Sequence, residues 1–253
     1  MTTSFIVFVI VAILIIALAS FRMGMKVSKA SKLESPDAQN ARPYEECLAQ
    51  NEQYFEYGTF TDPRDGETYR TIEIGKQVWM AENLRFKTEG SFAPDNDEKN
   101  VARYGRLYTW TAAMGIPSVF SDQQVDKDID IKNKMSDKNF RGIAPEGWHI
   151  PSDQEWEELA VFVSKKAKDA HIKLRSSCIW QKPGRDTYGF FALPAGYRFD
   201  NGCFCQFGKR TRFWSKNEYG SSNAYRFGLT EESADIEGVY RSDAISVRCV
   251  KNV

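Results

Sequence analysis

The residues that could carry out acid–base or metal chemistry are few in this chain. Only two histidines occur, His149 and His171. A protein zinc site needs several His or Cys ligands grouped together, and two distant histidines do not supply them. His149 stands between Trp148 and Ile150, which favours a packed or capping histidine over a general base. The sequence therefore predicts no metal site and no histidine-dependent catalysis.

Motifs for nucleophilic or phosphate chemistry do not occur in the sequence either. No Gly-x-Ser-x-Gly marks a nucleophile elbow, and no glycine-rich phosphate-binding loop is present. The acidic run from Asp95 to Glu98 offers oxygen ligands for Ca²⁺, but it lacks the glycine and the distal glutamate of a dedicated calcium loop. A solvated loop is the better interpretation. We expect a protein that is not an enzyme, with no catalytic residues, no metal and no cofactor.

Five cysteines, an odd number, leave at least one thiol unpaired within a monomer. Cys203 and Cys205 are one residue apart, so on a strand their side chains share a face and do not bond each other. No Cys-x-x-Cys occurs, which argues against structural zinc and against thioredoxin-type redox chemistry. The sequence leaves open how Cys47, Cys178, Cys203, Cys205 and Cys249 pair.

Aromatic residues are plentiful, with 17 Phe, 11 Tyr and 6 Trp. Flat rings stack on the apolar C–H faces of sugars, so exposed rings on loops would suit a carbohydrate-binding surface. The candidate binding residues lie in or near the later loops: Trp180, Tyr188, Trp214, Tyr219 and Tyr225. For any one of them, packing in the core remains the more common fate of an aromatic side chain.

Trp214 is the first choice among these binding candidates. Arg212 and Lys216 flank it, and such charges suit an exposed segment better than a buried one. Trp180 is the second choice, because the turn-forming segment Lys182-Pro183-Gly184 follows it. The alternative is that Trp214 anchors its strand in the core, in which case Trp214→Ala would unfold the domain.

The first 21 residues carry no charged side chain, and Phe5 to Ala19 is an unbroken apolar run. As a helix, this stretch can cross the roughly 30 Å hydrocarbon layer, so residues 1–21 predict a transmembrane anchor. The alternative is a signal peptide cut after Ala17-Leu18-Ala19. It is less favoured, because no Lys or Arg precedes the run. The basic residues that follow, from Arg22 onward, would hold that flank in the cytoplasm.

Composition places the rest of the chain among ordinary globular proteins. The 34 Lys and Arg residues balance 34 Asp and Glu residues, so electrostatics gives no case for a nucleic-acid partner. Polar residues 22–56 predict a linker that contains a short helix from Pro43 to Tyr54. Residues 57–253 then predict one domain, which is long enough to bury a single core.

The main helix is predicted to begin at Ser152. Ser152 and Glu155 have the spacing of a capping box, and further acidic residues fill the first turns, where they suit the positive end of the helix dipole. Apolar residues then recur at helical spacing from Trp156 to Ala167. This stretch predicts a core helix with one buried face.

A second helix is predicted from the face of Leu107, Trp110, Thr111 and Met114. The remaining pattern predicts short strands and turns. The expected strands are 68–74 and 77–80, joined by a two-residue turn, and later ones at 212–215, 223–229 and 244–250; residues 190–194 are an apolar stretch before them. Two main helices among small twisted sheets and long loops place the domain in the α+β class.

Six motifs occur in order along residues 57–253. They are Gly58-Thr59-Phe60-Thr61-Asp62, Trp79-Met80-Ala81-Glu82-Asn83-Leu84, Tyr104-Gly105-Arg106-Leu107-Tyr108-Thr109-Trp110, Gly147-Trp148-His149-Ile150-Pro151-Ser152-Asp153, Leu193-Pro194-Ala195-Gly196-Tyr197-Arg198 and Val247-Arg248-Cys249-Val250-Lys251. Together they resemble the Fibrobacter succinogenes major paralogous domain. This resemblance implies no established activity, and it implies exported, envelope-associated proteins.

More distantly, the helix start at Ser152 and the C-terminal strand resemble the formylglycine-generating enzymes and the C-type-lectin-like fold. The resemblance implies a C-type-lectin-like α+β domain with long surface loops. Copper-dependent oxidation in those enzymes needs a close thiol pair, and the sequence around Cys203 and Cys205 does not match their cysteine motif. Members of the paralogous family often carry cysteines where this chain has Ala93, Val101 and Ala144, so their usual disulfides are not expected here.

The leading hypothesis from the sequence is a non-catalytic, membrane-anchored domain of the bacterial cell envelope for adhesion or polysaccharide binding. The basic flank after residue 21 favours the cytoplasmic side, but the family resemblance implies export, and the hypothesis follows the resemblance and places the domain on the exported side. Its partners would be the membrane, through residues 1–21, and a polysaccharide or an envelope protein. The rival hypothesis is a structural subunit that uses the same domain only for protein–protein assembly.

Overall fold

The computed structural model describes residues 43–138 and 140–252. The transmembrane anchor predicted at residues 1–21 and the first part of the predicted linker lie outside these ranges. Within 43–138 and 140–252, no helix has the length and apolar character needed to cross a membrane.

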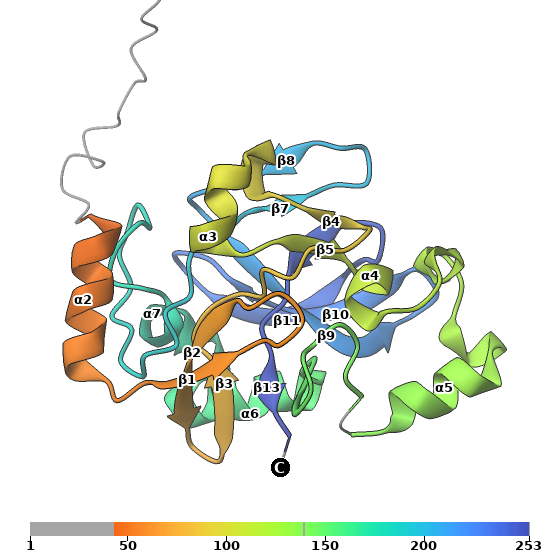
Figure 1. Cartoon of the computed structure of the whole chain (residues 1–253), viewed down its shortest axis with the longest axis horizontal. Coiled ribbons are helices and arrows are strands. Elements are labelled where there is room, and N and C mark those ends of the chain that lie inside the picture. Colours follow the sequence, from red (N-terminus) through yellow and green to blue (C-terminus); the bar gives the residue numbers. More distant parts are fainter. Residues whose placement is uncertain (1–42, 139, 253) are drawn as a thin grey trace, which may run out of the picture. The chain divides into compact units, whose positions relative to one another are not determined.

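The described residues form a mixed α+β fold with few helices (Figure 1). The helices are α2 (Tyr44–Tyr54), α3 (Val101–Tyr104), α4 (Trp110–Met114), α5 (Ile129–Ser136), α6 (Asp153–Val163) and α7 (Ala170–Leu174). The strands are β1 (Gly58–Thr61), β2 (Thr68–Ile74), β3 (Gln77–Met80), β4 (Ser91–Phe92), β5 (Leu107–Thr109), β6 (Trp148–His149), β7 (Tyr197–Arg198), β8 (Phe204–Cys205), β9 (Thr211–Tyr219), β10 (Asn223–Leu229), β11 (Ala234–Tyr240), β12 (Ala244–Ser246) and β13 (Val250–Lys251).

Two sheets organise the domain. The smaller has the order β1-β2-β3-β13-β6, and the larger has the order β11-β10-β9-β12-β5-β4 with β7 and β8 attached through β12. The named strands pair antiparallel except β12 and β9, which are parallel with Ser246 opposite Phe213. The last strands of the chain, β12 and β13, enter different sheets. The C-terminal segment therefore connects the two sheets.

The start of α6 confirms the capping box predicted from the sequence. The Ser152 hydroxyl accepts the backbone N–H of Glu155, and the Glu155 carboxylate accepts the backbone N–H of Ser152. The helix ends at Val163, earlier than the apolar pattern predicted, because Ser164 takes extended dihedral angles. Ala167 lies in the short 3-10 turn that follows.

Trp156 of α6 lies at the centre of one hydrophobic core cluster. Its ring stacks on Phe213 of β9 and Phe227 of β10, with centroid distances of 5.5 and 5.0 Å. The ring centroid of Trp79 in β3 lies 4.6 Å from that of Trp156. All four side chains are buried. These contacts place α6 across one face of the larger sheet.

The second helix predicted from the sequence is correct only in its last part. Leu107 to Thr109 form strand β5, since Leu107 pairs with Ser246 and Thr109 with Ala244 of β12. The Thr109 hydroxyl then accepts the backbone N–H of Ala112 and caps the five-residue α4. Pairing within the sheet therefore decides the structure of a segment whose spacing alone favours a helix.

Several other predicted elements are confirmed. Helix α2 matches the short helix expected from Pro43 to Tyr54, β2 and β3 flank the expected two-residue turn, and β10 has the expected bounds. Strand β11 (Ala234–Tyr240) is absent from the prediction. Asp235, Glu237 and Gly238 are poor strand formers, and their strand conformation comes from pairing with β10.

Candidate functional site

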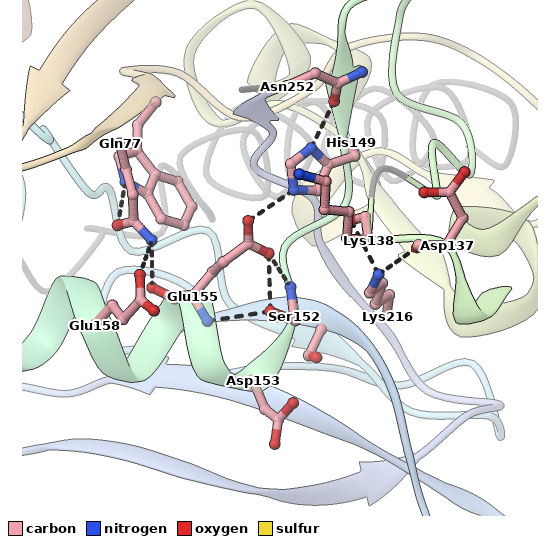
Figure 2. Close-up of polar contacts among 12 residues, drawn as sticks. Gln77, Asp137, Lys138, His149, Ser152, Asp153, Glu155, Glu158, Lys216 and Asn252 are labelled. Atoms are coloured by element: carbon pink, nitrogen blue, oxygen red, sulfur yellow. Dashed lines mark hydrogen bonds and ion pairs between the residues drawn. The ribbon is translucent and has the colours of Figure 1, made fainter.

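A group of polar side chains surrounds His149 at the start of α6 (Figure 2). The His149 Nε2 lies 2.8 Å from Oε1 of Glu155, and its Nδ1 lies 2.7 Å from the amide oxygen of Asn252. The other carboxylate oxygen of Glu155 accepts the Ser152 backbone N–H at 2.8 Å and the Ser152 hydroxyl at 2.9 Å. The His149 side chain is buried.

The hydrogen bonds of this network hold the His149 side chain against the start of α6. Burial alone would raise the pKa of Glu155, but hydrogen bonds with His149 and Ser152 outweigh it and hold the pKa below its usual value. Both ring nitrogens and both carboxylate oxygens already have partners. The network joins β6 and the C-terminal segment to the start of α6. The prediction that His149 is a packed histidine is confirmed.

Asp186 is a second carboxyl in an unusual environment. Burial raises its pKa to about 7, even though the Phe191 backbone N–H and the Asn51 amide donate hydrogen bonds to it. A raised pKa can mark a catalytic acid, but both oxygens of Asp186 are occupied by these donors. The contact with Asn51 instead fastens α2 to the domain.

Trp214 and Trp180, the two leading binding candidates, are buried in the core. The ring N–H of Trp214 donates to the carbonyl of Tyr108 at 2.7 Å, and that of Trp180 donates to the carbonyl of Ala192 at 2.9 Å. The expected exposure of Trp214 is wrong, because its basic neighbour Lys216 is itself buried and donates to backbone carbonyls. Neither ring can reach a ligand at the surface of this fold.

The three tyrosines among the candidates have more accessible rings, but they do not lie together. Tyr188 contacts Phe162 near the C-terminal end of α6, with ring centroids 5.9 Å apart. Tyr219 and Tyr225 lie beyond the opposite end of the helix and contact each other edge to face, with centroids 4.9 Å apart. The structure therefore brings Tyr219 and Tyr225 together and separates them from Tyr188.

A third tyrosine, Tyr240 of β11, completes an exposed aromatic surface with Tyr219 and Tyr225. Tyr219 and Tyr240 both lie opposite Asn223 of β10 in the strand register, so their side chains share one face of the sheet. A Cβ atom at Gly238 would lie 2.1 Å from the ring of Tyr219. This glycine therefore lets the ring lie against the backbone of β11. Tyr219 is 49% exposed and Tyr240 is 62% exposed. We call these three residues the tyrosine surface.

Tyr240 also borders a groove made of two adjoining concavities. The nearer concavity has a volume of about 590 Å³ and is lined in part by Tyr240 and Ser222. The second has a volume of about 560 Å³. Both are lined by Ser118, Ser121 and Ser242, so they adjoin. We call the two together the hydroxyl groove.

The lining of the hydroxyl groove is rich in hydroxyl groups and carboxylates. Thr88 and Thr109 add to its serines, and its charged residues are Glu89, Asp122 and Asp200. No Lys or Arg is among the described residues that line it. Carboxylates accept hydrogen bonds from hydroxyl groups, and Ser and Thr both donate and accept. The chemistry of this lining suits a neutral polyhydroxylated ligand better than an anionic one.

The acidic run considered as a calcium loop is engaged in local structure. Glu98 pairs with Arg106 through two hydrogen bonds of 2.9 and 3.1 Å, and the Asp97 side chain accepts the backbone N–H of Lys99. Across residues 43–138 and 140–252, no group of three or more His, Cys, Asp or Glu side chains is arranged to hold a metal ion.

Comparison with known proteins places this fold in a family. The model of the Fibrobacter succinogenes major domain matches residues 72–251, which is well over half of the chain. The chain belongs to this family. The matched Fibrobacter succinogenes major domain runs from within β2 to the end of β13 and includes the tyrosine surface and the hydroxyl groove. No curated protein and no solved structure matches the chain.

Sequence reasoning missed Tyr240 and Gly238 in this Fibrobacter succinogenes major domain. Both lie in β11, the strand that the sequence did not predict. A signal was present, since Ala234, Ile236 and Tyr240 fall on alternate positions with acidic residues between them. That alternation is typical of a half-buried edge strand.

Proposed function

We propose that this protein is a non-catalytic, membrane-anchored protein of the cell envelope whose domain binds polysaccharide. The single observation that carries this proposal is the exposed tyrosine surface beside the hydroxyl groove. The anchor predicted at residues 1–21 would attach the protein to the membrane, and the domain would face the exported side. The binding surface would then act as a C-type-lectin-like one, presented by the edge of a sheet and its neighbouring loops.

The tyrosine surface has the features of a sugar-stacking platform. Sugars present apolar C–H faces that pack on flat aromatic rings, while the phenolic hydroxyl can hydrogen-bond to the ligand. Tyr219 and Tyr240 come from strands on either side of β10, so both are held by sheet pairing rather than by a mobile loop. Rings held in this way lose little conformational entropy on binding, which favours affinity.

The hydroxyl groove extends this platform toward Glu89 and Asp200. Its length suits several sugar units in a row, since it joins two concavities of more than 500 Å³ each. The charged side chains among the described residues that line the groove are carboxylates, so we propose neutral glucans, xylans or mannans as the ligand class. Acidic polymers such as polygalacturonate would meet like charges at Glu89, Asp122 and Asp200.

Retention of the full-length protein on insoluble polysaccharides tests this function. The protein in detergent should be retained by at least one neutral polysaccharide among cellulose, xylan and mannan, and polygalacturonate should retain it less. Tyr54→Ala is a matched control, because Tyr54 is 72% exposed on α2 and is not part of the tyrosine surface. Absence of retention of the wild-type protein on every neutral polymer and on peptidoglycan would contradict the proposal.

Assembly with another protein is a second candidate function, and a different surface supports it. Val161 and Phe162 are each 55% exposed on the outer side of α6. Phe162 and Glu158 of α6 line a concavity of about 680 Å³ together with the β2–β3 turn at Gly75. Exposed apolar side chains grouped in this way can mark protein–protein contacts. Phe162→Asp should abolish co-purification with an envelope protein if assembly is the function, and polysaccharide retention should be unchanged.

A further inference from the structure

Arg241, in the turn between β11 and β12, has a fully buried side chain. Its guanidinium group has five N–H donors, and five oxygen atoms surround it. Four are backbone carbonyl oxygens at 2.7 to 3.0 Å, and the fifth is a carboxylate oxygen at 2.7 Å; they belong to Phe120, Gln123, Gly220, Asn223 and Glu218. A buried charge is costly unless it is paired and hydrogen-bonded, so these partners hold the side chain in one place.

The nearer concavity of the hydroxyl groove lies between two walls that are far apart in the chain. The first wall comes from residues 118–123, and the second comes from Ser222, Tyr240 and Ser242. Arg241 stands between Tyr240 and Ser242 in the sequence. Its backbone therefore belongs to the second wall, while its side chain points into the protein.

The guanidinium group of Arg241 bonds to both walls of this concavity. Its Nη1 donates to the carbonyls of Phe120 and Gln123, which lie in the first wall. Its Nη2 and Nε donate to the carbonyls of Gly220 and Asn223, which lie in the β9–β10 turn of the second wall. The separation of the two walls therefore depends on one planar group with fixed donor directions.

Glu218 of β9 strengthens this connection. The carboxylate oxygen that pairs with Arg241 also accepts the backbone N–H of Val125 at 2.9 Å. Val125 is buried and follows the first wall in the chain. Glu218 directly precedes Tyr219, so the same carboxylate joins the end of the first wall to the strand that carries the tyrosine surface.

We propose that Arg241 is a positioning residue for polysaccharide binding, which lets a ligand stacked on the tyrosine surface continue into the hydroxyl groove. This inference rests on the function proposed above. Arg241 is buried and does not touch the ligand; it acts by holding the two walls apart at one distance. Lysine cannot replace it, because an ammonium group has three donors and no planar fork. At least two of the five oxygens would then lose their N–H partner.

The affinity of the full-length protein for short and long oligosaccharides tests this role. Isothermal titration calorimetry in detergent can compare the two-unit and six-unit oligosaccharides of cellulose, xylan and mannan. For at least one of these sugars, the wild type should bind the six-unit ligand more tightly. Arg241→Lys should weaken binding of that ligand about tenfold and change binding of the two-unit ligand less than about twofold, because a short ligand stays on the tyrosine surface.

A second variant keeps the test decisive if Arg241→Lys does not fold. Glu218→Ala leaves all four carbonyl contacts of Arg241 in place but frees the backbone N–H of Val125. It should weaken binding of the six-unit ligand about threefold. Glu67→Ala is the matched control, because Glu67 also pairs with a largely buried arginine, Arg85, and lines neither concavity. It should change both affinities less than about twofold.

Two results would overturn the inference while the proposed function stands. The first is a folded Arg241→Lys or Glu218→Ala variant that gains as much affinity from two to six sugar units as the wild type does. The second is an equal loss for both lengths, which would show that Arg241 supports the domain as a whole. A wild-type protein that binds none of the oligosaccharides or their polymers would instead contradict the proposed function, and this inference would fall with it.

Discussion

The two ends of one sheet face use aromatic residues in opposite ways. Under α6, Phe213 and Phe227 are buried against Trp156. Beyond the start of the helix, the same face of the same strands carries Tyr219, which is 49% exposed, and Tyr225, which contacts it. Tyr225 and Phe227 are two residues apart on β10. Cover by helix α6, rather than position on a strand, therefore determines whether an aromatic side chain on this face is buried in the core or exposed at the surface.

This contrast explains why only some of the predicted binding residues have exposed rings. Spacing along β9 identifies which residues share a face, but it does not tell where α6 begins to cover that face. Trp214 is buried on the opposite face, where its ring N–H reaches β5. Tyr219 lies at the end of the same strand, beyond the part of the sheet that α6 covers, and is exposed. A single sequence contains no local mark of that boundary.

Removing the ring of Trp156 should give the largest loss of stability. Trp156→Ala should lower the free energy of unfolding by about 3–5 kcal/mol, because it leaves a cavity between Phe213 and Phe227. Val161→Ala on the same helix is the control, since Val161 is 55% exposed. Urea unfolding followed by tryptophan fluorescence measures both. Equal and mild effects of the two changes would mean that α6 is not the core element of this sheet.

The neighbouring pair on β10 makes the comparison sharper. Phe227→Ala should cost about 3–5 kcal/mol, as for other buried aromatic side chains. Tyr225→Ala, two residues away on the same face, should cost about 1 kcal/mol, the value expected for one edge-to-face contact. Thermal unfolding monitored by circular dichroism can compare the two variants. A cost for Tyr225→Ala that equals that of Phe227→Ala would show that both ends of the face are covered.

The start of α6 should show a smaller effect. Ser152→Ala removes the N-cap hydrogen bond and should cost about 1 kcal/mol. Thr61→Ala is a suitable control, because the Thr61 hydroxyl bonds only another exposed threonine at the surface. Denaturant midpoints of the two variants measure the difference. A change near zero in the free energy of unfolding for Ser152→Ala would mean that packing alone determines where α6 begins.

Acid should lower the stability of the protein by protonating Glu155 at the start of α6. The pKa of Glu155 in the folded protein lies below its usual value of 4.5, so its contribution is fully present above pH 4.5 and is lost as pH falls through the folded pKa. Glu155→Gln should therefore remove part of the loss of stability between neutral pH and about pH 3. Urea unfolding at several pH values measures this. If the stability of Glu155→Gln and of the wild type changed with pH in parallel, Glu155 would not be a source of the acid-dependent loss of stability.

The fold was more predictable from the sequence than the candidate site. The capping box, β10 and the β2–β3 turn follow from local residue chemistry, which the chain shows directly. Strand β5 depends on pairing with β12, far along the chain, and β11 depends on pairing with the neighbouring β10; neither strand was predicted. The tyrosine surface needs β11 to deliver Tyr240 and Gly238 beside Tyr219. Its existence therefore rests on pairing between strands that the sequence alone does not reveal.

Gly238→Ala should displace the tyrosine surface with a small effect on stability. The new methyl group would meet the ring of Tyr219, a flexible side chain, so the ring should move rather than the sheet. We expect weaker polysaccharide retention with a melting temperature within about 2 °C of the wild type. Unchanged retention would show that the position of the Tyr219 ring does not matter.

The most direct test pairs retention with stability for Tyr240→Ala. The account predicts that this variant melts within about 2 °C of the wild type. It also predicts an affinity for the retained polysaccharide that is roughly thirtyfold weaker, as for a loss of about 2 kcal/mol at a binding hot spot. Tyr54→Ala should change neither quantity. A Tyr240→Ala variant that binds as the wild type does, or one that melts as early as Trp156→Ala, would contradict the claim that the uncovered end of the sheet is the binding surface.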